Sequence, residues 1–226
     1  MEKYLGPTYY IDSDHPDVIE FADRNIKDEQ TIIEKAVCLY YAVRDNIRYD
    51  PYSMETIKES MKASYVLKKR RGYCVAKAVL LAACARSQNI PARLGFADVN
   101  NHLNTKKLRK LMGTDIFYYH GFTELFLNNQ WVKATPAFNI DLCNNFNVKP
   151  LEFNGTDDSI FHPFDKSGNK HMEYIKDHGS FADLPWERIM AVAQKAYPQY
   201  FKNTKRQSSD FTKEALKENQ GYSLFN

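Results

Sequence analysis

Two segments near the start of the chain carry the signals of amphipathic helices. Asp14, His15 and Pro16 form a helix start, because a capping side chain and an early proline both deal with unpaired N–H groups. A short helix to about residue 23 is expected to follow. A longer helix is predicted over residues 30–46, where apolar residues recur on one face. That face comprises Ile32, Ile33, Ala36, Val37, Tyr40 and Val43, with Ile47 just beyond it.

Residues 74–87 are apolar nearly all round. Only Lys77 and Arg86 carry charge in a stretch otherwise rich in alanine, leucine and valine. A helix on a protein surface has a polar face, whereas a helix without one is buried. The pattern therefore predicts a helix in the middle of the domain.

Strands follow this apolar segment. Residues 92–99 are expected to form one strand, and residues 116–127 and 130–138 form two more. The last two are joined at Asn128-Asn129, a pair that tolerates the positive φ of a tight hairpin. Between the strands, residues 100–113 form a polar, lysine-rich insertion that is expected to make a rim or lid over a site. Helices first and antiparallel strands after them indicate the α+β class.

The pattern weakens beyond the last strand. A loop-rich stretch leads to a helix over about residues 184–197, and residues 201–226 form a polar tail that is expected to be partly disordered. With 226 residues, of which 43% are hydrophobic, the chain can bury one substantial core. We expect a single domain over residues 1–200, with its core at about 30–140 and a C-terminal extension over 141–200.

Composition narrows the range of partners. Lys and Arg total 31 against 28 Asp and Glu, so a net charge of +3 gives no strong field for nucleic acid or an anionic membrane. No basic and apolar leader follows Met1 and no apolar run is long enough to span a membrane, so a cytoplasmic protein is predicted. The four cysteines form no CxxC pair, and nothing fixes His162, His171 and His178 as metal ligands. No cofactor or metal is predicted, and the oligomeric state stays open.

The apolar helix begins with a cysteine. Arg71-Gly72-Tyr73-Cys74 places a thiol in its first turn, directly after a glycine that can make a sharp entry turn. A helix N-terminus carries partial positive charge and unpaired N–H groups, which favour thiolate over thiol and can hold an oxyanion. The competing interpretation is a small buried hydrophobe, which is common for free cysteines.

A histidine on a following strand is the second candidate. Strand alternation places His120 on one face of the sheet, where its ring nitrogens require partners. The other residues on that face are Tyr118, Phe122, Glu124 and Phe126. A lone histidine among aromatic residues is more often structural. A catalytic role for His120 is therefore inferred only in combination with Cys74.

The hairpin gives a register that can be checked within the sequence. A two-residue turn pairs Phe126 with Trp131, Glu124 with Lys133 and Phe122 with Thr135, which includes one aromatic pair and one pair of opposite charges. Continued along the strand, this register places Ala137 opposite His120. Thr135 and Asn139 are then its diagonal neighbours.

Together these residues match a family pattern. In chain order it consists of Gly72-Tyr73-Cys74, Ala78, Leu81, Ala82, Asn89-Ile90-Pro91-Ala92-Arg93, His120-Gly121-Phe122-Thr123-Glu124-Leu125, Trp131 and Pro136. Over roughly residues 34–139 the chain resembles the core of bacterial transglutaminase-like proteins. The resemblance implies a papain-like core, in which a cysteine on a central helix packs against an antiparallel sheet that presents the histidine and an acidic third residue. It also implies that Cys74 attacks an amide carbonyl to form a thioester that water or an amine releases, while His120 handles the proton.

The sequence departs from the family pattern at the third catalytic position. Where the family usually has aspartate before the proline of the strand, this chain has Thr135. Threonine can accept an imidazole hydrogen bond, but it supplies no negative charge to favour imidazolium. Asn139 is geometrically equivalent in the predicted register, and Asp141 has the right parity. We rank Thr135 first, Asn139 second and Asp141 third.

Other functions stay open at this point. Thr135 in place of an acid motivates a transglutaminase-like binding module that has lost turnover. The Arg71-Gly72 lead into Cys74 resembles that of arylamine N-acetyltransferases, which also use a Cys-His-Asp set. In the leading hypothesis, a cysteine hydrolase or acyltransferase acts on a peptide, a protein glutamine side chain or a small amide. Tyr73 and Trp131 are candidates for shaping its pocket.

Overall fold

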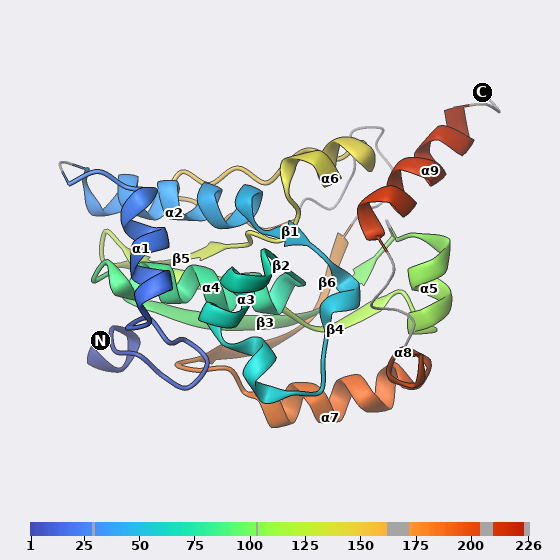
Figure 1. Cartoon of the computed structure of the whole chain (residues 1–226), viewed down its shortest axis with the longest axis horizontal. Helices are drawn as coiled ribbons and strands as arrows, with labels where there is room; N and C mark the ends of the chain where they lie inside the picture. The colour runs from blue at the N-terminus through green and yellow to red at the C-terminus, as the bar shows by residue number, and fades with distance from the viewer. Residues whose placement is uncertain (29, 103, 162–171, 204–209, 224–226) are drawn as a thin grey trace.

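The computed structural model describes residues 1–28, 30–102, 104–161, 172–203 and 210–223, which form an α+β fold (Figure 1). The α-helices are α1 (Pro16–Arg24), α2 (Ile32–Asn46), α3 (Ala63–Lys69), α4 (Cys74–Ser87), α5 (Lys106–Met112), α6 (Ile140–Asn145), α7 (Trp186–Ala196), α8 (Pro198–Lys202) and α9 (Phe211–Ser223). The strands are β1 (Arg48–Tyr49), β2 (Arg71–Gly72), β3 (Ala92–Asn101), β4 (Ile116–Leu127), β5 (Gln130–Ala134) and β6 (Met172–Phe181). Short 3-10 helices occupy Glu2–Tyr4, Pro51–Ser53 and Lys58–Met61.

The main sheet has the strand order β5-β4-β3-β6, and every neighbouring pair in it is antiparallel. The predicted hairpin is confirmed: Asn128 and Asn129 both adopt positive φ, at 47° and 63°. The predicted pairs Phe126 with Trp131 and Glu124 with Lys133 are also formed. The α+β prediction with an antiparallel sheet is therefore correct.

The predicted register fails beyond the end of β5. This strand stops at Ala134 instead of continuing to residue 138, because Ala134 forms a parallel bridge with Ser159. The backbone N–H of Thr135 then donates to the carbonyl of Ser159 at 3.1 Å. Consequently the pairs of Phe122 with Thr135 and of His120 with Ala137 are not formed. On the other side of β4, His120 pairs with Ala97 of β3.

Strand β6 is one element that the sequence pattern missed, and helix α9 lies in the C-terminal segment. β6 lies in a stretch predicted as loop, and its pairing with β3 contains two register shifts that break the alternation of its side chains. α9 lies in the predicted polar tail, yet Phe211 is buried and its ring lies 5.9 Å from that of Tyr49. Phe211 thus packs the start of α9 on the core, and the expected partial disorder within residues 201–226 stays a prediction.

Helix α4 is the centre of the fold, as its apolar sequence predicts. All its residues from Cys74 to Arg86 are buried, and it packs against β3 and β4 as well as against α1, α2 and α3 (Figure 1). Among the described residues, no helix is both long and apolar enough to cross a membrane.

Lys77 is fully buried within α4 and ties this helix to its surroundings. Its Nζ donates to the carbonyls of Arg44, Ile47 and Ala137 at 2.8, 2.6 and 2.8 Å. Burial lowers the pKa of the Lys77 amine, because it penalises the charged form. The three carbonyl acceptors act in the opposite direction, because they match the three protons of an ammonium group. Lys77 thereby connects the end of α2, the chain entering β1 and the segment after β5.

We predict that Lys77→Met destabilises the protein by about 3 kcal/mol, because it leaves three buried carbonyls without a donor at a cost of about 1 kcal/mol or more each. Urea unfolding followed by circular dichroism measures this. Lys68→Met, at an exposed position of α3, is the matched control and should change stability by less than about 0.5 kcal/mol. Equal stability of the two variants would contradict the anchoring role.

Candidate active site

Cys74 is the first residue of α4, and its side chain is only 7% exposed. Tyr73 is the N-cap residue and makes no side-chain capping bond, so it leaves the first-turn N–H groups uncapped. Gly72 lets the chain pass close to the first turn of α4, because a Cβ there would lie 2.9 Å from the Cβ of Ala76. The predicted arrangement of glycine, tyrosine and a helix-terminal thiol is present.

The protonation of Cys74 differs from the sequence-based expectation. Burial raises the pKa of the thiol to about 11, although hydrogen bonds from the backbone N–H groups of Gly121 and Val75 act in the opposite direction. Desolvation penalises the charged form, and here it outweighs the helix terminus. Cys74 is therefore a neutral thiol near pH 7 in this structure.

His120 lies on β4 and is also buried. Its ring packs against Phe161 with centroids 5.2 Å apart. Among the described residues, its Nε2 has no hydrogen-bond partner. Burial lowers the pKa of His120 to about 4, so the imidazole is neutral at pH 7. Cys74 and His120 thus form a neutral pair rather than a thiolate and an imidazolium.

A close backbone contact brings the two residues together. A Cβ at Gly121 would lie 2.9 Å from the Cα of Val75, so only glycine allows β4 to approach the first turn of α4. Cys74 precedes Val75 and His120 precedes Gly121. As a result, the thiol and the imidazole line the same pocket.

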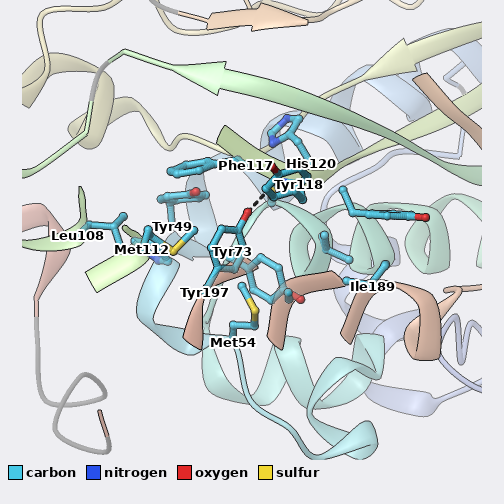
Figure 2. A pocket seen from close by; sticks show the side chains of 15 residues that line it. Tyr49, Met54, Tyr73, Leu108, Met112, Phe117, Tyr118, His120, Ile189 and Tyr197 are labelled. Atoms are coloured by element: carbon cyan, nitrogen blue, oxygen red, sulfur yellow. Dashed lines mark hydrogen bonds between the residues drawn. The ribbon is translucent and has the colours of Figure 1, made fainter. Parts of the chain in front are cut away.

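The pocket has a volume of about 40 Å³ and mostly aromatic and aliphatic walls. Besides Cys74 and His120, its lining comprises Tyr49, Pro51, Met54, Tyr73, Val75, Leu108, Met112, Phe117, Tyr118, Tyr119, Ile189, Ala193 and Tyr197. Figure 2 draws these side chains, which come from separate parts of the chain. Tyr73 lies there as predicted, whereas Trp131 does not: its ring stacks under the guanidinium of Arg93, 4.1 Å from the centroid, at the hairpin end of the sheet.

Among the described residues, no third residue is hydrogen-bonded to Nε2 of His120. The hydroxyl of Thr135 is buried and, within the described part of the chain, has no hydrogen-bond partner. Asn139 is engaged elsewhere, because its Oδ1 accepts the N–H of Tyr49 at 3.1 Å. Asp141 is exposed in the first turn of α6 and so does not meet the buried ring. The prediction places Asn139 and Asp141 near His120 by continuing β5 past Ala134. The strand ends at Ala134, so neither residue takes that position.

Asp98 is a residue near the site that sequence reasoning missed. Its Oδ1 accepts the N–H of Tyr119 at 3.0 Å and lies 2.7 Å from Nε2 of His178. Tyr119 has φ of 55°, and the β3–β4 register shifts at this point. Such a bulge redirects side chains, and here it immediately precedes His120. An aspartate within the apolar strand was the signal available in the sequence.

The histidines considered as metal ligands do not come together in the described structure. His178 pairs with Asp98 and stacks on Tyr119, with ring centroids 4.0 Å apart. His162 and His171 lie outside the described residues. No group of three or more potential metal ligands occurs in the part of the chain that is described.

Comparison with known proteins identifies the family. The model of the transglutaminase-like superfamily matches residues 19–136, which is more than half of the chain. The chain therefore belongs to this superfamily, and the predicted resemblance is confirmed. This places it among families of cysteine-dependent enzymes without specifying a reaction.

One similar solved structure is described as "a Putative Cysteine Protease from Cytophaga hutchinsonii". It shares 17% sequence identity over 79% of this chain and 53% of that chain, with a TM-score of 0.47. The chain thus spans about half the length of that protein. No curated protein matches the sequence.

We predict that Gly121→Ala separates β4 from α4 and abolishes labelling of Cys74 by thiol probes directed at the pocket. The added Cβ overlaps the backbone of Val75, which cannot move as a flexible side chain would. Gly6→Ala is the control, because a Cβ there meets nothing within 4 Å. Normal labelling and normal stability of Gly121→Ala would show that the close contact is dispensable.

The neutral pair predicts a specific pH profile. Alkylation of Cys74 by iodoacetamide should be slow at pH 7 and accelerate about tenfold per pH unit toward pH 10, because only the thiolate reacts and its pKa is about 11. His120→Ala should leave the pH range over which the rate rises unchanged, because His120 does not set the pKa of the thiol. Peptide-resolved mass spectrometry measures the rate, with half-buried Cys38 as internal control. A rate plateau below pH 8 that disappears in His120→Ala would instead indicate an ion pair.

Proposed function

We propose that this protein is a cysteine hydrolase or acyltransferase that acts on an amide through a thioester intermediate. The observation that supports it is the placement of a thiol in the first turn of α4 and an imidazole of β4 on the wall of one pocket. Cys74 is the nucleophile and His120 the general base and acid. The substrate is a peptide, a glutamine side chain or a small amide, and neither nucleic acid nor membrane is a partner.

Because both groups are neutral, proton transfer accompanies attack. Sγ forms a bond to the carbonyl carbon while His120 takes the thiol proton. His120 then gives this proton to the leaving nitrogen as the C–N bond breaks, which leaves a thioester on Cys74. Water or an amine attacks the thioester and restores the thiol. A buried imidazole with a low pKa is a weak base, but it is uncharged and able to accept a proton at pH 7.

The N–H groups of Val75 and Gly121 are our assignment for the donors that stabilise the oxyanion. Both act on Sγ by lowering the pKa of the thiol, so they are close to the carbon that Sγ attacks. Thr135 is our assignment for the residue that orients His120. Its hydroxyl and Nε2 of His120 are both buried and unpaired in the described structure, and a hydrogen bond between them would satisfy both.

A binding module without turnover is the second candidate. It is favoured by the neutral thiol and by the lack of a carboxylate bonded to His120 among the described residues. Such a protein would retain the pocket but form no covalent intermediate. The two candidates therefore differ in whether Cys74 becomes acylated.

We predict that 4-nitrophenyl acetate acetylates Cys74 with a stoichiometric burst of 4-nitrophenolate, because the activated ester bypasses the need for the natural substrate. Mass spectrometry of the intact protein should show one acetyl group. Cys74→Ala should lose the burst completely, His120→Ala should slow it by about 100-fold, and the matched control Cys38→Ala should retain it. Equal acetylation of wild type and Cys74→Ala would support the binding module. Efficient acetylation from acetyl coenzyme A would favour an arylamine N-acetyltransferase-like reaction.

A further inference from the structure

The walls of the pocket around Cys74 carry no full charge. None of its lining residues is Asp, Glu, Lys or Arg in the described part of the chain, and His120 is neutral at pH 7. Three of its tyrosines, Tyr49, Tyr73 and Tyr197, also stay neutral there, since burial raises the pKa of each. A charged group entering this pocket would lose its hydration without gaining a counter-ion, which is strongly unfavourable.

Several polar groups of the pocket are already used. The hydroxyl of Tyr197 donates to the carbonyl of Ile116 at 3.1 Å and accepts the N–H of Tyr118 at 2.7 Å. The hydroxyl of Tyr73 lies 3.6 Å from the sulfur of Met61. Tyr197 therefore fixes the wall at β4 and does not serve as a donor for a ligand. The remaining contacts that the wall offers are mainly apolar.

The size of the pocket limits what can enter it. A dry cavity that accepts benzene has a volume of about 150 Å³. The volume of about 40 Å³ next to Cys74 is much smaller and admits a group of only a few carbon atoms. The acyl part of a substrate stays on Sγ through both steps, whereas the leaving group departs. The small space beside Sγ therefore suits the acyl part.

Two elements outside the central helix and its sheet close this space. Leu108 and Met112 come from α5 in the insertion between β3 and β4, and Ile189 and Ala193 come from α7. α7 lies beyond the segment that matches the family, residues 19–136. The size of the pocket is thus set in part by a segment outside that match.

We infer that the substrate presents a short, uncharged aliphatic acyl group to Cys74, and that α5 and α7 enforce this limit. The inference rests on the proposed function and specifies its substrate class. Ile189 and Met112 are the size-determining residues, because each contributes a bulky apolar side chain to the wall. Carboxylate-bearing, long-chain and aromatic acyl groups are excluded by charge or by volume.

A series of N-acetylcysteamine thioesters that differ only in the acyl group tests this inference. Acetyl and propionyl thioesters should acylate Cys74 at least tenfold faster than hexanoyl, benzoyl or succinyl thioesters. The readout is the rate at which each acyl adduct appears on the intact protein by mass spectrometry. A hexanoyl, benzoyl or succinyl adduct that forms as fast as the acetyl adduct would overturn the inference.

Enlarging the pocket should reverse the size preference. Ile189→Ala and Met112→Ala, on different helices, should each raise the hexanoyl rate relative to the acetyl rate at least tenfold. Met190→Ala is the matched control, because Met190 is buried on α7 but does not line the pocket. If both enlarged variants keep the wild-type order, α5 and α7 do not set the limit. If no thioester acylates Cys74 in the wild type, the proposed function itself fails, which is distinguishable from a changed order of preference.

Discussion

The contact of Gly121 with the first turn of α4 is the constraint on which the site depends. A strand and a helix can approach this closely only where no side chain separates them. The contact sets Cys74 beside the N–H of Gly121 and leaves His120 on the next residue, so both reach one pocket. The packing of β4 against α4 also buries this central helix. The same burial removes water from the Cys74 thiol and the His120 imidazole.

Burial and the helix terminus act on Cys74 in opposite directions. The terminus and its N–H groups favour thiolate, but in this pocket desolvation is the larger effect and the pKa rises to about 11. The same desolvation keeps His120 neutral. An aspartate behind the histidine would favour imidazolium, whereas Thr135 cannot. A neutral pair and an uncharged third position are therefore consistent with each other, and proton transfer during attack replaces a preformed ion pair.

The pocket is formed jointly by the central helix, the sheet and two further helices. The core supplies the thiol, the imidazole and the backbone donors, while α5 and α7 supply apolar side chains that leave little free volume.

Lys77 stabilises the core from inside α4. By donating to three carbonyls, it fixes the chain before β1 and after β5 relative to α4. The position of Thr135 thus depends on a buried amine as well as on the sheet.

The sequence by itself determined the buried α4, the Asn128-Asn129 hairpin and the candidacy of Cys74 and His120, because each depends on local pattern or on matched motifs. Only the tertiary structure decided where β5 ends, since the bridge from Ala134 to Ser159 joins residues distant in the chain. Long-range packing likewise brought Asp98 to Tyr119, added β6 to the sheet and buried Phe211 of α9. The pKa values and the pocket volume could not be predicted, because they depend on the summed burial by many separate segments.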